Sequence, residues 1–294
     1  MIYDSNGIES LGNSLSYICT NTSPRSEVLP NSLGFRSVDF RLGLNLRESI
    51  KKISLVLSAT RDLEIETEAV MIEHDGNIVL TFLLCCHFFR KDIFLDCHNC
   101  SVEYQRGGML IYAANFLLLF FCGPILGARL VLHNDLIRRK FPLKAAVMYT
   151  PYPDLSAYIG KEKVNDVIFS CSLNRDEPVA RIIDACLKLG QQGYSCRISG
   201  NTEKLDASLR SKGEKYFTNY LSKHGYLSLL ASSRLMVSLT DRKDTVLFSP
   251  REGISLGLKV LANNSQANLD FYGDKIITVS TEDDLAEVIR DALR

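Results

Sequence analysis

The hydrophobic and polar positions in the second half of the chain alternate between two periods. Residues 166–172 form a β-branched apolar run, and residues 176–190 then place their apolar side chains on one helical face. This alternation predicts further strands over 194–200, 235–240, 258–262 and 275–280, and helices over 226–234, 249–257 and 282–294. Strands separated by helices are parallel and joined by crossovers, so we expect an open α/β sheet that binds its ligand beyond the carboxyl ends of its strands.

The helix over 176–190 carries the clearest boundary signals. Asp176 or Glu177 is predicted to cap it, Pro178 opens its first turn, and Lys188 with Gly190 marks its end. The residues predicted to share its buried face are Val179, Ile182, Ile183, Cys186 and Leu187.

The first half of the chain gives a weaker version of the same pattern. Apolar runs that end in polar residues predict strands at 51–60, 68–76, 91–99 and 127–135, with helices over 76–90 and 109–127. The first sixty residues are irregular. The pattern lapses between 149 and 160, where Pro and Gly accumulate. We therefore expect two α/β domains, 1–150 and 151–294.

Composition excludes several classes of protein. Of 294 residues, 46% are apolar and 23% charged, which indicates a folded chain. The 34 basic and 34 acidic side chains balance, and there is no long basic run, so we expect no nucleic-acid partner. Nine cysteines, several in apolar runs, do not form a disulfide framework. The first ten residues lack the features of a signal peptide. A reducing, cytoplasmic setting fits best.

The segment 109–127 bears on membrane contact. Its 19 residues carry no charge, and a helix of 19 residues is just long enough to span a bilayer. Asn115 near its middle and Gly123-Pro124 near its end interrupt it. These interruptions favour a buried helix, or one that rests on the inner face of the membrane, over a spanning helix.

A cysteine–histidine cluster at 97–100 resembles a metal site. Cys97 and Cys100 have ligand spacing, but no second pair follows at the distance that a structural zinc site requires. Cys97 and His98 are adjacent, so they point to opposite faces of an extended chain. We interpret 96–99 as the polar end of a strand and predict no metal site.

The string "TDRKDTVLFSPREGISLGLKVLANN", residues 240–264, is the most specific motif. Asp244 is followed by seven residues and then Glu252, which opens a helix that leads into a strand. This arrangement resembles the GT-B glycosyltransferases, in particular the family-4-like enzymes of bacterial cell-surface polysaccharide assembly. The resemblance covers residues 70–294 and is strongest after 160. In that family the first acid is usually glutamate, whereas this sequence has Asp244. Many members also have a glycine-rich loop near the start, and no such loop is recognisable in this sequence.

The resemblance implies two Rossmann-like domains that face a cleft, with the acceptor on domain 1–150 and a nucleotide-sugar on domain 151–294. It implies transfer of a sugar to a glycan or lipid-linked acceptor, with retention, without a metal, and with no cofactor besides the donor. The candidate catalytic residues are Asp244 and His98. The candidate donor-binding residues are Glu252, Arg175, Lys204, Gly200, Asn201, Thr240 and Ser249. The candidate acceptor-side residues are Asp96, Asn99 and His133.

Elementary chemistry is consistent with part of this assignment. A helix start offers free N–H groups to a diphosphate. An ionised carboxylate such as Glu252 only accepts hydrogen bonds, so it suits ribose hydroxyls. Arg175 and Lys204, after two different strands, are placed to neutralise phosphate charge.

Each residue also has a plainer interpretation. Residues 249–252 read as a capping box, in which Glu252 would only bond the backbone of Ser249. Arg175 could be solvated, and Lys204 could lie on a surface helix. Two other functions stay open: a nucleotide-sugar epimerase, which usually has more histidines in this half than His224, and a non-catalytic binding subunit of a polysaccharide assembly complex.

Overall fold

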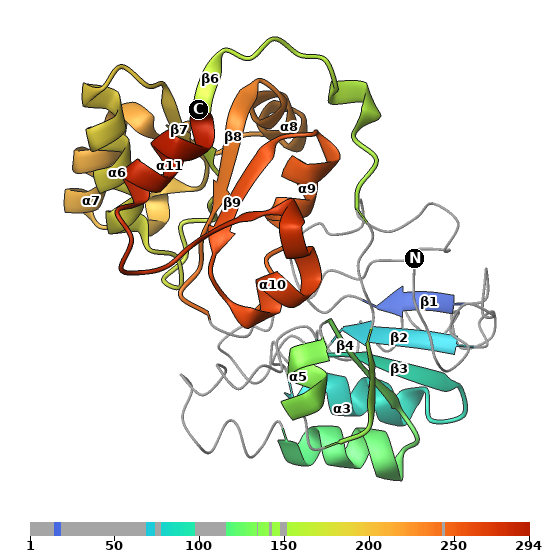
Figure 1. Ribbon diagram of the computed structural model, residues 1–294. Coiled ribbons are helices and arrows are strands. Elements are labelled where there is room, and N and C mark those ends of the chain that lie inside the picture. Colours follow the sequence, from blue (N-terminus) through green and yellow to red (C-terminus); the bar gives the residue numbers. More distant parts are fainter. Residues whose placement is uncertain are drawn as a thin grey trace. The chain divides into compact units, whose positions relative to one another are not determined.

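The computed structural model describes residues 15–18, 69–73, 78–97, 116–133, 135–140, 143–147, 152–242 and 245–294. The chain divides into two compact units, Met1–Pro151 and Tyr152–Arg294. Each unit has a parallel sheet of its own (Figure 1).

The N-terminal unit contains a parallel sheet with strands in the order β1-β2-β3-β4-β5. Its elements are β1 (Leu15–Ile18), β2 (Ala69–Glu73), α3 (Ile78–His87), β3 (Asp92–Asp96), a helix over 116–120 that continues as the π-helix η3 (Phe121–Ile125), β4 (Arg129–Leu132), α5 (Asp135–Lys140) and β5 (Ala145–Val147). The strands expected within 68–76, 91–99 and 127–135 are confirmed in shorter form, whereas residues 51–60 lie outside the described ranges. The sequence did not predict α5 or β5.

The core of this unit explains why its helices are almost uniformly apolar. Leu84 and Cys85 of α3 are buried in one cluster with Leu118, Leu119 and Cys122 of the second helix. Both helices also pack on strand residues of β3 and β4. Among the helices that the structure describes, none combines the length and the apolar character needed to cross a lipid bilayer.

The C-terminal unit has a second parallel sheet, with strands in the order β10-β9-β8-β6-β7. The strands are β6 (Asn165–Phe169), β7 (Cys196–Ile198), β8 (Ser233–Ser238), β9 (Lys259–Asn263) and β10 (Ile277–Val279). The α-helices are α6 (Val179–Gln191), α7 (Ala207–Gly213), α8 (Lys223–Ala231), α9 (Ser249–Ser255), α10 (Gln266–Tyr272) and α11 (Leu285–Leu293). Every strand predicted after residue 160 is confirmed. The sequence did not predict α7 and α10, although parallel neighbours such as β9 and β10 require a crossover between them.

Alternate residues of each strand face the two helix layers. Val167, Leu235 and Val237 belong to the core with α6 and α11. Met236 and Val260 point the other way, toward α9, where Gly253 contacts both. Figure 1 shows α6 and α11 on one face of the sheet and α8 with α9 on the other. The sheet is therefore doubly wound, as the alternation of strand and helix predicted.

The connections reverse direction between β6 and β8. The chain moves from β6 outward to β7, and then returns past β6 to place β8 on its other side. The loops after β6 and β8 therefore diverge, which defines the switch point where open α/β sheets bind their ligands.

The segment between the unit boundary and β6 is fastened along the outer surface of α8. It contains the short 3₁₀ turn η4 (Ser156–Tyr158). Three side-chain hydrogen bonds hold it there: Tyr158 Oη with His224 Nδ1 at 3.1 Å, Lys161 Nζ to Ser228 Oγ at 2.8 Å, and Lys163 Nζ to the Ala231 carbonyl at 2.8 Å.

The predicted cap of α6 is wrong. The helix begins at Val179 after Pro178, and no side chain caps it. Asp176 and Glu177 instead make contacts within the loops at the sheet edge. The predicted buried face is confirmed for Val179, Ile182, Ile183 and Cys186, while Leu187 is partly buried.

Close packing of α9 on the sheet gives a test of this architecture. A Cβ added to Gly253 would lie 2.6 Å from Met236 Sδ and 2.7 Å from Val260 Cγ2. We expect Gly253→Ala to lower the free energy of unfolding by about 1–3 kcal/mol, the range for an overpacked core. Urea denaturation measures it, with Ser255→Ala on the same helix as the control. Equal stability of the two variants would contradict this packing.

Candidate functional site

Three loops of the C-terminal unit meet at the carboxyl edge of its sheet. They follow β6 (170–178), β7 (199–206) and β8 (239–248). Five of the seven predicted donor-binding residues lie in these loops at the carboxyl edge of the sheet: Arg175, Gly200, Asn201, Lys204 and Thr240. Parallel strands thus bring together polar residues that are up to 65 positions apart in sequence, from Arg175 to Thr240.

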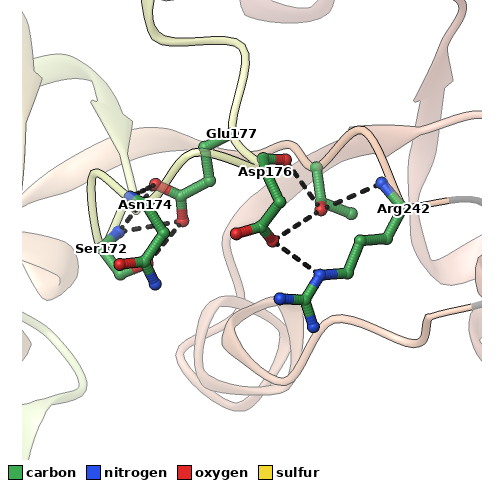
Figure 2. A network of polar contacts seen from close by, with 6 residues as sticks. Ser172, Asn174, Asp176, Glu177 and Arg242 are labelled. Atoms are coloured by element: carbon green, nitrogen blue, oxygen red, sulfur yellow. Dashed lines mark hydrogen bonds and ion pairs between the residues drawn. The ribbon is translucent and has the colours of Figure 1, made fainter. Parts of the chain in front are cut away.

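Asp176 joins the first loop to the third. Its carboxylate Oδ2 lies 2.9 Å from Arg242 Nε, and Thr240 Oγ1 donates toward its backbone carbonyl at 3.1 Å and its Oδ2 at 3.3 Å. The Asp241 amide also donates to the Asp176 carbonyl, at 2.7 Å. Figure 2 shows the Asp176 and Arg242 side chains directed at each other. Thr240, 6% exposed, therefore connects the loops.

Glu177 turns back on its own loop. Its carboxylate accepts hydrogen bonds from the Ser172 amide at 3.0 Å, the Ser172 hydroxyl at 2.9 Å and the Asn174 amide at 3.3 Å (Figure 2). Between these donors Leu173 adopts the left-handed conformation, with φ of 57°. Such a conformation in a residue with a side chain persists only where its surroundings fix it. Glu177 therefore stabilises the strained turn after β6.

The second loop is attached to the first. Lys204 is exposed in a short helical turn, consistent with a surface position, and its Nζ donates to the Ser172 carbonyl at 2.9 Å and to Asn174 Oδ1 at 2.8 Å. Gly200 has φ of 132°, and a Cβ there would lie 2.6 Å from Leu173 Cγ. Glycine is thus required for the loops to approach. Asn201 caps the short 3₁₀ turn η5 (Thr202–Lys204) by accepting from the Glu203 amide at 3.0 Å.

The two predicted phosphate-binding cations differ in their contacts. Lys204 bonds two neutral oxygens and no carboxylate among the described residues. Arg175 is exposed and makes no hydrogen bond or ion pair with a described residue. Neither positive charge has a carboxylate partner among the described residues, which favours binding of an anion at this edge of the sheet.

Glu252 does not cap its helix. The helix α9 starts at Ser249 with no side-chain cap, and the Ser249 hydroxyl instead lies 2.6 Å from the Ser238 hydroxyl. Glu252 Oε2 accepts a hydrogen bond of 2.9 Å from Tyr226 Oη on α8. The interpretation of 249–252 as a capping box is therefore wrong.

The surroundings of Glu252 shape its protonation. Burial raises the pKa of the Glu252 carboxyl above its ordinary value, while the Tyr226 hydroxyl and the Lys223 charge act in the opposite direction. Burial also raises the pKa of Tyr226 well above its usual range, so the phenol keeps its proton and donates it. The site thus holds a partly desolvated carboxylate.

Arg251, the residue before Glu252, is buried with 2% exposure between the rings of Phe248 and Phe271, 4.5 and 4.6 Å from its guanidinium carbon. No carboxylate pairs with it among the described residues, and its Nε and Nη1 atoms have no hydrogen-bond partner there. Burial accordingly lowers the pKa of Arg251. Aromatic faces stabilise this cation in place of a counter-charge.

In the N-terminal unit two predicted acceptor-side residues form a pair. Asp96 ends β3 and His133 follows β4, and Asp96 Oδ1 lies 2.6 Å from His133 Nε2. Both are buried. The other predicted residues, His98, Asn99 and Asp244, lie outside the described ranges.

The metal question concerns the same strand end. Cys97 is buried, and its thiol donates to the Leu95 carbonyl at 3.3 Å. In the described part of the chain no group of three or more His, Cys, Asp or Glu side chains is arranged to bind a metal ion. His98 and Cys100 are not among those residues.

The fold is shared with several solved proteins. HepE from Anabaena, solved in complex with UDP and glucose, has a TM-score of 0.70 at 10% identity, covering 96% of this chain and 90% of HepE. A UDP-forming trehalose-phosphate synthase from Burkholderia xenovorans has a TM-score of 0.61 at 9% identity, over 96% and 91% of the two chains. The fold is of the GT-B type.

A third GT-B neighbour is named as an epimerase and not as a glycosyltransferase. A Listeria monocytogenes protein that bears the name of a UDP-N-acetylglucosamine 2-epimerase has a TM-score of 0.61 at 12% identity, over 96% of this chain and 88% of its own. No protein-family model and no curated protein matches the sequence. Identities this low relate the chain to its neighbours through the GT-B fold.

The site includes residues that sequence reasoning missed. Tyr226 was assigned to a helix predicted to start at that residue, but α8 begins three residues earlier, after the capping Ser222. The Ser222 cap in "LSKHG" was the available signal. Asp176, Glu177 and Arg242 were not proposed as a network, because the positions of their loops depend on the strand order.

Burial of Glu252 predicts a pH-dependent effect of Glu252→Gln on stability. Because the folded-state pKa is raised, the contribution of this carboxyl is most favourable below its unfolded pKa and is lost as pH rises through the folded pKa. We expect the variant to melt at or above the wild-type temperature at pH 7.5, with the difference shrinking toward pH 4.

The matched control is Glu282→Gln. Glu282 is exposed, and the Thr281 hydroxyl lowers its pKa, so this variant should show no gain at pH 7.5. Scanning calorimetry from pH 4 to 8 measures both. A Glu252→Gln protein that melts below wild type at pH 7.5, with a gap that closes on acidification, would contradict the burial argument.

Proposed function

We propose that the protein is a glycosyltransferase that takes a sugar from a nucleotide-sugar bound at the carboxyl edge of the C-terminal sheet. The observation that carries this proposal is the half-buried Glu252 carboxylate, which is held by Tyr226 and not used as a helix cap. The other oxygen of this carboxylate, Glu252 Oε1, makes no hydrogen bond with a described residue. Such an oxygen suits a ribose hydroxyl, because an ionised carboxylate only accepts.

Charge supports a phosphorylated donor. Arg175 and Lys204 lie in the loops after β6 and β7 without a carboxylate partner among the described residues. Two positive charges beside the switch point would neutralise a diphosphate and stabilise the charge that develops on it as the glycosidic bond breaks.

The finer assignments follow from the resemblance of the motif at 244–252. We propose the N-terminal unit as the acceptor-binding part, with Asp96 and His133 as a prearranged pair, and Asp244 and His98 as the residues nearest the transferred sugar. We further propose a retaining, metal-independent transfer to a glycan or lipid-linked acceptor in surface polysaccharide assembly. HepE, solved with UDP-glucose, is the neighbour whose bound ligand fits this proposal.

An epimerase is the second candidate, because one GT-B neighbour carries that name. The chain has one histidine after residue 133, His224, and its Nδ1 is engaged by Tyr158. This leaves few groups for proton transfer at the sugar, which favours glycosyl transfer. Incubation with UDP-glucose, UDP-N-acetylglucosamine and GDP-mannose distinguishes the two: release of nucleoside diphosphate marks transfer or hydrolysis, whereas an isomeric nucleotide-sugar marks epimerisation.

The decisive variant is Glu252→Gln. If the carboxylate accepts both ribose hydroxyls, the amide replaces one acceptor by a donor and removes the charge. Donor affinity should then fall by about 1.5–3 kcal/mol, the range for hydrogen bonds to charged groups. Isothermal calorimetry with nucleoside diphosphates measures it, with Glu287→Gln on α11 as the control. Wild-type affinity in Glu252→Gln would remove Glu252 from the donor site.

Asp244→Asn is a separate test. It should lower turnover more than donor binding, because Asp244 is proposed to lie near the transferred sugar.

The N-terminal unit also carries a surface that fits a membrane. Two helices that pack together through their buried faces expose large apolar side chains on their outer faces. These residues are Phe82 of α3, Phe89 in the turn that follows α3, and Leu117, Phe120, Phe121 and Ile125 of the second helix, exposed by 40–57%. Arg90 lies over the Phe89 ring at 5.3 Å and adds positive charge beside them. Apolar rings with adjacent cations favour contact with an anionic lipid surface, and we propose that a lipid-linked acceptor reaches the protein there.

Vesicle binding tests this surface. The protein should cosediment with vesicles that contain anionic lipid and be released by carbonate extraction. The double substitution Phe120→Ser with Phe121→Ser should weaken binding at least tenfold, because it removes two exposed rings. Ile159→Ser, 63% exposed in the other unit, is the control. Equal binding of all three proteins would contradict the proposal, and retention after carbonate extraction would indicate a spanning segment instead.

A further inference from the structure

A chain of three side chains ends at Glu252. Ser170 Oγ lies 2.7 Å from Tyr226 Oη, and Tyr226 Oη donates to Glu252 Oε2 at 2.9 Å. A hydroxyl has one proton to donate. Because Tyr226 gives its proton to the carboxylate, Ser170 must be the donor in the first bond. The direction of the chain is thus Ser170 to Tyr226 to Glu252.

The first two members are fixed by the fold. Ser170 directly follows β6, and its amide donates to the Val237 carbonyl of β8 at 2.8 Å. Tyr226 lies in the first turn of α8, whose start is fixed by Ser222 accepting from the Gly225 amide at 3.1 Å. A sheet edge and a capped helix therefore define where the Tyr226 hydroxyl is, and through it the position of the Glu252 carboxylate.

We infer that Tyr226 is a positioning residue for donor binding, which fixes Glu252 Oε2 so that Oε1 faces the ribose hydroxyls. This inference rests on the proposed function. The hydroxyl occupies one carboxylate oxygen and leaves the other for the ligand. Holding a ligand group in its bound orientation beforehand reduces the ordering cost of binding.

Tyr226 also affects the charge of Glu252. The groups that interact with this carboxyl are Tyr226 and Lys223 from α8 and Tyr272 from α10. Arg251 precedes Glu252 on α9, with its guanidinium between the rings of Phe248 and Phe271. Burial raises the pKa of Glu252, and the Tyr226 hydroxyl is the foremost influence that lowers it. Without the hydroxyl, the pKa of Glu252 would be higher. As the pH falls, the carboxylate would then become protonated at a higher pH and lose its ability to accept two hydrogen bonds there.

The test is Tyr226→Phe in the full chain. Binding of UDP, GDP, ADP and dTDP is measured by calorimetry between pH 5 and 9. We expect the Kd of the nucleotide that wild type binds best to rise about tenfold at pH 7.5. The pH below which binding weakens should also move upward. A role limited to packing the ring would not produce this second change.

Two comparisons isolate the hydroxyl. Tyr216→Phe removes a buried hydroxyl that bonds no described residue, in the 3₁₀ turn η6 (Glu214–Tyr216) beside β7, and should bind as wild type. In a Glu252→Gln background, Tyr226→Phe should add less than twofold, because the carboxylate it positions is gone. Ser170→Ala should weaken binding in the same direction but less, since it acts through Tyr226. Thermal melts confirm that each variant is folded.

The outcomes separate this inference from the function it rests on. If wild type binds a nucleotide and Glu252→Gln weakens that binding, but Tyr226→Phe matches wild type in affinity and pH dependence, the positioning role is wrong. The role is equally wrong if Tyr226→Phe weakens binding by the same factor with and without Glu252. If wild type binds none of the four nucleotides, the donor site itself is overturned.

Discussion

Parallel pairing of β6 with β8 determines where every polar residue of the C-terminal unit can act. The pairing places Ile168 opposite Met236 and Phe169 opposite Val237, so the two strands end at the same level. Their loops then leave in opposite directions, and the side chains of Asp176, Thr240 and Arg242 close the space between them. The same pairing sets Ser170 beside α8 and so fixes the position of Glu252. A sheet with another strand order would separate these groups.

The sequence predicts the C-terminal sheet well because its elements have strong local signals. Strand 165–169 contains the apolar run Val167–Phe169, and α6 has a regular apolar face. It does not predict α10, whose seven residues show little periodicity, and it places the start of α8 too late. Both errors concern short helices, in which tertiary packing contributes more than local preference.

The candidate site is only partly predictable for a different reason. Glu252 can be found from its spacing to Asp244, but its partner Tyr226 lies 26 residues earlier on another helix. Likewise, Asp176 and Glu177 have the composition of a helix cap, and only the loop after β8 explains why Asp176 serves elsewhere. Arg251 is a further case. In sequence it reads as part of a polar tetrapeptide, whereas the fold encloses it between two aromatic rings.

The segment that follows the unit boundary gives α8 a mechanical role. Tyr158, Lys161 and Lys163 attach this segment to α8 before the chain reaches β6. Tension applied to the backbone near Tyr152 would therefore load α8 first and the central strand only afterwards. Because α8 also bears Tyr226, this helix contacts both the segment 152–164, which we call the tether, and the Glu252 carboxylate. A fragment cut immediately before Asn165 would keep every strand of this sheet and still lack the tether.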